Sequence, residues 1–336
     1  MEQKIVCDKN LKLSLETLED QPTALLENEV LIKPLSIGIC GSDIHQFEKR
    51  TESFCLGHEW VGEVISAGAQ SQFKASDLIT SPAKIFCGEC HFCQTRETNL
   101  CEKGILIGGD DKSLLRTWVI FETRHLLRLP KMKIEALALL EVAAIADQAI
   151  RKLQSLEKKK DKLLIFGAGA VGLLTALSAK RQGYQVLLVE KEGFRVKVGL
   201  SLAIETMPLA MFISDTDFRH SFSTIIDCTG DSRGQKGAMS LLPFYASVNS
   251  SIIFVGIYNN THEFQQSLYQ RLSSKISWVS GASKKNFEES IEFWKEDIEL
   301  IHEKLITHSF PLKEINQAIE TAKDTQSSLK VLISLK

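Results

Sequence analysis

The chain has 336 residues, and this length predicts two domains because single hydrophobic cores rarely grow beyond roughly 250–300 residues. Its composition, 44% hydrophobic and 24% charged, is ordinary for a globular protein and excludes a disordered or fibrous chain. The 40 basic and 42 acidic residues leave a net charge of −2, which offers no electrostatic footprint for nucleic acid or an anionic membrane. We therefore expect a small-molecule partner.

The first ten residues, MEQKIVCDKN, lack the basic and apolar regions of a signal peptide. No uninterrupted apolar stretch approaches the ~18 residues that a membrane span needs. We therefore expect a cytoplasmic protein. In a reducing compartment, clustered cysteines indicate metal binding rather than disulfides.

The first part of the chain, from residue 4 to about residue 130, is predicted to be mostly β. Short apolar runs are separated there by Gly, Pro and polar residues, and examples are 30–32, 61–65 and 118–121. Apolar residues at helical spacing then predict a helix within 134–156.

The second part alternates predicted strands with predicted helices, a pattern that favours a doubly wound parallel sheet. The strands are expected at 163–166, 186–189, 224–226 and 252–255, with a helix at 170–181 after the first strand. The tail is predicted to form a helix around 287–305 and a final strand at 331–333.

Four cysteines lie close together in the spacing C-x2-C-x2-C-x7-C: Cys87, Cys90, Cys93 and Cys101. Four thiolates from one short loop can form a closed tetrahedral zinc site, although an iron-sulfur cluster also accepts cysteine ligands alone. A site filled by four protein ligands leaves no position for substrate. We therefore expect this zinc to be structural and catalysis to lie elsewhere.

A second set of metal ligands lies upstream, within 38–45 and 57–62. Cys40, His58 and Glu59 offer one thiolate, one imidazole and one carboxylate. Such a mixed set is typical of a catalytic zinc that keeps one position open for water or substrate.

A glycine-rich turn, Gly167-Ala168-Gly169-Ala170-Val171-Gly172, follows a predicted strand and precedes a predicted helix. This is the context in which G-x-G-x-x-G binds the pyrophosphate of a dinucleotide. Glu190 ends the next strand, where a carboxylate can accept hydrogen bonds from the ribose 2′-hydroxyl and so favour NAD over NADP. Lys191 and Arg195 follow, and Lys191 need not share the face of Glu190 because side chains alternate along a strand.

The chain resembles the zinc-containing medium-chain alcohol dehydrogenases, and in particular their sorbitol, threonine and sugar-acid (L-galactonate-type) branch. The resemblance covers nearly the whole length. It is carried by 38–45, 57–59, the four-cysteine loop, 167–172 and 227–230. It implies a GroES-like, mostly β catalytic domain at 1–148, an NAD-binding Rossmann domain at 149–283, and a segment at 284–336 that returns to the catalytic domain.

The resemblance also implies roles for individual residues. Cys40 and His58 become zinc ligands, and Asp43 supports His58. The third ligand is either Glu59 or Glu141, and this choice stays open. The chain departs from the family at Val142, where a proline is usual, and at 110–118, which lacks the usual Gly-Gly-Phe.

The implied reaction is hydride transfer to NAD from a secondary alcohol such as a polyol, a sugar acid or an amino alcohol, in a homodimer or homotetramer. Ser42 and His45 would relay the proton to solvent. Val171 and Arg195 join the glycines and Glu190 as cofactor-binding residues. The alternatives are a zinc-lacking quinone or enone reductase and an NAD-binding protein without a competent catalytic zinc.

Overall fold

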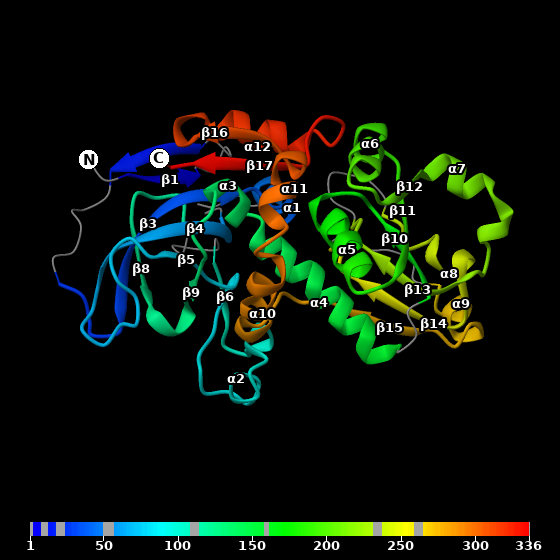
Figure 1. Cartoon of the computed structure of the whole chain (residues 1–336), viewed down its shortest axis with the longest axis horizontal. Coiled ribbons are helices and arrows are strands. Elements are labelled where there is room, and N and C mark those ends of the chain that lie inside the picture. The colour runs from blue at the N-terminus through cyan, green and yellow to red at the C-terminus, as the bar shows by residue number, and fades with distance from the viewer. Residues whose placement is uncertain are drawn as a thin grey trace. The chain divides into compact units, whose positions relative to one another are not determined.

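A computed structural model describes residues 3–7, 13–17, 24–49, 57–107, 114–157, 161–230, 237–258 and 265–335 (Figure 1). The chain forms two compact units. Unit 1 contains Met1–Ala144, Gly281–Asp324 and Lys330–Lys336, and unit 2 contains Ile145–Ser280 and Thr325–Leu329. No helix in the described ranges is both long enough and apolar enough to cross a membrane.

Unit 1 is built on a sheet of seven described strands. Strand β3, whose burial is nearly continuous, lies inside the sheet and pairs with β4, β8 and β17. The strand order is β16 (Ile306–Pro311), β17 (Lys330–Ser334), β3 (Glu29–Gly38), β4 (Glu59–Ala67), β5 (Leu78–Thr80) and β9 (Leu127–Arg128), with β8 (Val119–Glu122) beside β3. The apolar runs at 30–32 and 61–65 thus lie within strands of this sheet.

Two small sheets and several helices complete the described part of unit 1. Two two-stranded antiparallel sheets pair β1 (Gln3–Cys7) with β2 (Leu13–Thr17) and β6 (Lys84–Ile85) with β7 (Ile105–Leu106). The helices are α1 (Gly41–Lys49), α2 (His91–Gln94), α3 (Ile134–Leu137), α10 (Lys284–Trp294), α11 (Ile298–Leu305) and α12 (Ile315–Lys323), with 3-10 turns at Thr98–Leu100, Thr123–His125 and Leu312–Glu314.

Unit 2 contains a parallel sheet of six described strands in the order β12-β11-β10-β13-β14-β15. The strands are β10 (Lys162–Phe166), β11 (Gln185–Glu190), β12 (Glu205–Pro208), β13 (Phe222–Asp227), β14 (Ala246–Phe254) and β15 (Lys275–Trp278). The helices are α5 (Ala170–Arg181), α6 (Gly193–Ser201), α7 (Leu209–Ser214), α8 (Leu242–Tyr245) and α9 (Gln266–Arg271), with a 3-10 turn at Thr216–Phe218. This order reverses between β10 and β13, as in dinucleotide-binding sheets, and it confirms the predicted α/β fold.

Two predicted helices are interrupted in the structure. The stretch 134–156 forms α3 and α4 (Leu140–Leu156), because the Leu139 amide bonds to the Ala136 carbonyl three residues back and tightens one turn. The stretch 287–305 is likewise divided into α10 and α11, where the Asp297 amide bonds to the Trp294 carbonyl. Neither break carries a proline or glycine, so no residue type marks its position in the sequence.

Candidate metal centres and dinucleotide site

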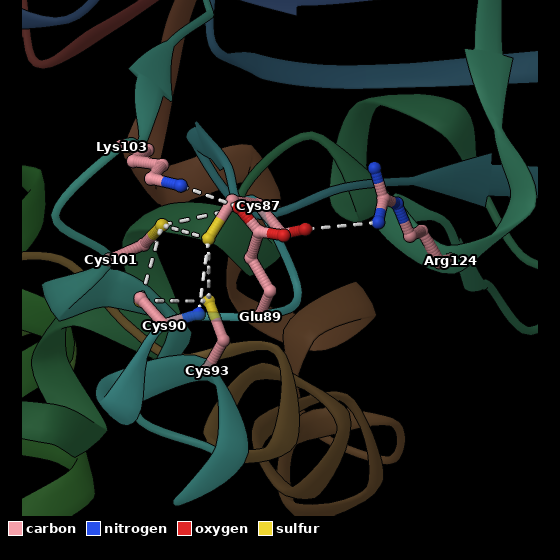
Figure 2. Close-up of polar contacts among 7 residues, drawn as sticks. All are labelled: Cys87, Glu89, Cys90, Cys93, Cys101, Lys103 and Arg124. Atoms are coloured by element: carbon pink, nitrogen blue, oxygen red, sulfur yellow. Dashed lines mark hydrogen bonds and ion pairs between the residues drawn. The ribbon is translucent and has the colours of Figure 1, made fainter.

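The four cysteine side chains of the loop converge on one point (Figure 2). The sulfur of Cys101 lies 3.5 Å from that of Cys87 and 3.8 Å from that of Cys90. The sulfur of Cys93 lies 3.6 Å from that of Cys90 and 3.9 Å from that of Cys87. Four sulfurs held about 2.3 Å from one zinc ion at tetrahedral corners are about 3.8 Å apart. The loop therefore fits a single zinc ion, and its centre has no room for a cluster of several iron and sulfide atoms.

Cationic side chains surround this four-cysteine loop. An Arg124 Nη donates to the Cys87 carbonyl at 3.1 Å, and Lys103 forms an ion pair with Glu89 at 2.5 Å (Figure 2). Gly88 has a φ of +82°, and an ideal Cβ placed there would lie 3.0 Å from that Arg124 nitrogen. The positive φ of this tight turn therefore favours glycine, and a side chain here would also crowd the guanidinium.

The second ligand set is brought together by the pairing of β3 with β4. Gly38 lies opposite Glu59, so Cys40, which follows the end of β3, meets His58 and Glu59 at the start of β4. One ligand atom from each of the three lies within 4.8 Å of the others. An ideal Cβ on Gly38 would lie 2.3 Å from a Glu59 carboxylate oxygen, so only glycine fits opposite that side chain.

Asp43 connects two members of this set. Its carboxylate accepts a hydrogen bond from the Cys40 amide at 2.9 Å, as an acidic residue in the first turn of a helix does for the residue that caps it. Its other oxygen lies 3.3 Å from His58 Nδ1. Burial lowers the pKa of His58, but the nearby negative charges of Asp43 and Cys40 outweigh it and hold that pKa well above its ordinary value. With Nδ1 facing Asp43, the Nε2 atom of His58 remains for a metal.

Lys330 is a site residue that the sequence analysis missed. Its ammonium group lies 2.5 Å and 2.7 Å from the two Glu59 carboxylate oxygens and 3.2 Å from the Ile39 carbonyl, and both side chains are buried. Burial lowers the pKa of Lys330, but the charges of Glu59 and Cys40 raise it above its usual value. The only signal in the sequence is a lysine directly before an apolar strand, a position that is exposed in most proteins.

Glu141 lies in the first turn of α4 and is buried. Burial raises the pKa of its carboxyl to about 7, with the charge of His58 opposing and that of Glu59 adding to the shift. Within the described ranges Glu141 does not join the group of ligand atoms that lie within 4.8 Å of one another. Ser42 and His45 lie on α1 and are both partly exposed.

Unit 2 contains a pocket at the carboxyl ends of its strands, and the glycine-rich turn lines it. Gly167 has a φ of +94°, and an ideal Cβ on Gly172 would lie 1.8 Å from the Gly167 carbonyl oxygen. Both positions therefore require glycine. Gly169 caps the start of α5, where free backbone amides attract a pyrophosphate, and Val171 lies half-buried in the first turn.

Glu190 is buried beside the glycine-rich turn. Its carboxylate accepts hydrogen bonds from the amides of Ala168 at 2.6 Å, Lys191 at 2.7 Å and Glu192 at 2.9 Å. The Arg195 guanidinium donates to the Ser328 carbonyl at 2.9 Å. Glu190, Arg195 and Lys191 all line the pocket, although strand alternation did not require Lys191 to share the side of Glu190.

A mostly β unit with two thiol-containing metal sets and a Rossmann unit with a dinucleotide pocket define a zinc-binding, dinucleotide-linked oxidoreductase. Residues 26–131 match the family model described as "Alcohol dehydrogenase GroES-like domain". The chain is 27% identical to a sorbitol dehydrogenase from Halalkalibacterium halodurans over 92% of both chains. It is 25% identical to the L-galactonate-5-dehydrogenase of Escherichia coli over 88% of both chains.

Among solved structures, the fold matches galactitol-1-phosphate dehydrogenase from Escherichia coli with a TM-score of 0.85 and 18% identity, over 99% of both chains. The chain is thus similar, over most of its length, to polyol and sugar-acid dehydrogenases, and this similarity agrees with the family resemblance that the sequence predicted.

Proposed function

We propose that the chain is a zinc-dependent dehydrogenase that transfers hydride from a secondary alcohol to NAD. The observation that carries this proposal is the grouping of Cys40 and His58 in unit 1 with a buried carboxylate beside them, that of Glu59 or that of Glu141. Three protein ligands of mixed type leave a coordination position for a substrate oxygen. The same chain carries a dinucleotide pocket in unit 2.

The residues of unit 1 would orient and activate the alcohol. Asp43 fixes the His58 ring and the Cys40 backbone, so the ligand atoms keep their places. A bound zinc ion supplies Lewis acidity that lowers the pKa of a coordinated hydroxyl. Ser42 and His45, on α1, would carry the released proton to solvent, because a hydroxyl and an imidazole can each both accept and donate a proton.

The residues of unit 2 would bind and select the dinucleotide. The turn Gly167 to Gly172 would hold the pyrophosphate against the start of α5. Glu190 would accept a hydrogen bond from the ribose 2′-hydroxyl with lone pairs that its three amide donors leave available, and Arg195 would lie beside the ribose. NAD supplies the hydride acceptor.

We favour Glu141 over Glu59 as the third catalytic ligand. Both carboxylate oxygens of Glu59 already contact the Lys330 ammonium, whereas the Glu141 carboxyl is buried close enough to His58 to feel its charge. Glu141→Ala should then lower zinc affinity or turnover by at least about tenfold. Wild-type kinetics for this variant would assign the role to Glu59.

The substrate class of polyol, sugar acid or amino alcohol, the assembly into a homodimer or homotetramer, and the cytoplasmic location stay predictions. The segment 110–118, where the family pattern is absent, lies partly outside the described residues.

Metal analysis with a substrate panel tests the proposal. We expect two zinc ions per chain and NAD reduction with at least one polyol, sugar acid or threonine. One zinc ion with no alcohol oxidation would instead favour a zinc-lacking reductase or a silent NAD-binding protein.

A further inference from the structure

A carboxylate that the reaction described above does not use lies at the carboxyl end of β13. Asp227 is fully buried, and burial raises the pKa of its carboxyl. One oxygen accepts hydrogen bonds from the Thr229 amide at 2.9 Å and the Thr229 hydroxyl at 2.6 Å. The other accepts one from the Tyr258 hydroxyl at 2.5 Å. Within the described part of the chain these three donors are all uncharged. The Asp227 carboxylate is therefore stabilised by hydroxyl and amide groups and not by a cationic side chain.

Each of the two hydroxyls also accepts a hydrogen bond from a backbone amide. Thr229 Oγ1 accepts from the Ala238 amide at 2.9 Å, and the Tyr258 hydroxyl accepts from the Met239 amide at 3.0 Å. Two consecutive amides therefore connect through two hydroxyls to one carboxylate. A hydroxyl that donates to a carboxylate becomes a stronger acceptor. The negative charge of Asp227 therefore strengthens the hydrogen bonds that the two hydroxyls accept from the amides.

These amides belong to a wall of the dinucleotide pocket. Thr229, Gly237 and Ala238 all line that pocket. An ideal Cβ on Gly237 would lie 2.4 Å from the Tyr258 hydroxyl and 2.7 Å from Thr229 Oγ1, so the wall packs directly on the hydroxyl pair. Tyr258 itself follows β14 and therefore joins the end of this strand to the wall.

We propose that Tyr258 is a positioning residue for the dinucleotide, which holds the pocket wall at Gly237–Met239 through its hydroxyl and the Asp227 carboxylate. The inference rests on the NAD-binding part of the proposed function and deepens it. Without the Tyr258 hydroxyl the Met239 amide loses its acceptor and one Asp227 oxygen loses its donor. The wall must then become ordered when the dinucleotide binds, and the free energy of this ordering weakens binding.

The test compares four variants by NADH titration followed calorimetrically, with the melting temperature of the cofactor-free protein measured in parallel. Tyr258→Phe and Thr229→Val each remove one hydroxyl, and each should raise the Kd for NADH about tenfold, since each leaves a carboxylate oxygen short of a donor. Thr229→Ser keeps its hydroxyl and should bind NADH within about twofold of the wild type.

Tyr269→Phe is the matched control. Its hydroxyl donates to the Met239 carbonyl at 3.0 Å. This variant therefore also removes a tyrosine hydroxyl that contacts Met239, but the hydrogen bonds to Asp227 stay in place. We expect a Kd within about twofold of the wild type. In steady-state assays Tyr258→Phe should raise the KM for NAD and leave the KM for the alcohol unchanged.

Three results would overturn the inference. The first is an unchanged Kd in Tyr258→Phe, whatever its melting temperature. The second is an equal loss in Tyr269→Phe, which would indicate general loosening. The third is an equal loss of NADH affinity in Thr229→Ser and Thr229→Val. The comparison of these two variants also tests the inference if Tyr258→Phe does not fold. A wild type that fails to bind NADH would refute the proposed cofactor and the inference with it.

Discussion

The Lys330 ammonium and the Glu59 carboxylate form an ion pair in which the two side chains are 5% and 2% exposed. Two charges in such a setting are stabilised chiefly by each other and by their hydrogen bonds. The Ile39 carbonyl accepts one further hydrogen bond from Lys330. The pair therefore holds β17 to the segment that carries Cys40.

Lys330→Met should lower the free energy of unfolding of unit 1 by about 3–5 kcal/mol, because it leaves Glu59 as a buried charge without a partner. Denaturant unfolding measures this. The double variant with Glu59→Gln removes both charges and should recover much of the loss. A single variant as stable as the wild type would show that Glu59 finds another cation, such as the metal itself.

Cys40→Ser should remove the catalytic zinc while Cys90→Ser removes the structural one. Each variant should retain one zinc ion per chain by elemental analysis. Cys40→Ser should lose turnover but keep its fold and its NADH affinity, whereas Cys90→Ser should chiefly lower the melting temperature, since a structural zinc contributes folding energy. Full turnover in Cys40→Ser without the second zinc would refute the mechanism.

Glu190 should make NAD the better cofactor by at least about tenfold in kcat/KM, or about 1.4 kcal/mol. Its carboxylate repels a 2′-phosphate, while Lys191 and Arg195, which line the same pocket, attract one. Glu190→Ser should narrow the preference. Equal efficiency with NADP in the unmodified protein would show that the two basic side chains outweigh Glu190.

At the scale of elements, the four-cysteine loop docks on the 3-10 turn Thr123–His125 and on the start of α10. The His125 ring is buried and packs edge-on against Phe86, with ring centroids 4.7 Å apart. The Lys284 side chain donates to the Arg124 carbonyl at 2.8 Å. Burial, together with the charges of Arg124 and Lys284, lowers the pKa of His125 to about 4.

This pKa makes the stability of unit 1 pH-dependent. In the unfolded chain His125 has its ordinary pKa of 6.5, so the unfolded state binds a proton first as the pH falls. The contribution of neutral His125 is complete above about pH 6.5 and is lost as the pH falls toward 4. His125→Phe should flatten the melting temperature between pH 7 and pH 5 in zinc-loaded protein, and the exposed His91→Gln should not. Parallel curves for His125→Phe and the wild type would contradict this reading.

Elements with local causes could be predicted from the sequence, and contacts between distant segments could not. The spacing of Cys87 to Cys101 and the turn Gly167 to Gly172 fix their own geometry within a few residues. By contrast, the Lys330 contact with Glu59 spans 271 residues, and Tyr258, which follows β14, contacts Asp227 at the end of β13. No local pattern distinguishes these side chains from exposed ones.

At the scale of the whole molecule, zinc and the dinucleotide are expected to act on different units. Removing both zinc ions with a chelator should reduce amide protection from hydrogen exchange around the four-cysteine loop and in the 57–62 segment. Adding NADH should raise protection around 167–172, 228–230 and 237–241, where residues line the pocket. Loss of protection in unit 2 on chelation, to the same extent as in unit 1, would show that the two units unfold as one.

The position of β17 within unit 1 has a consequence for synthesis of the protein. The carboxyl-terminal part of β3 pairs with β17, and the other edge of β17 pairs with β16. A ribosome makes β3 early and β17 only after the whole of unit 2. Until then one edge of β3 lacks its neighbour and Glu59 lacks its cation, while most of unit 2 is already free to fold. The N-terminal half of the nascent chain should therefore depend on chaperones for longer than the segment that follows it.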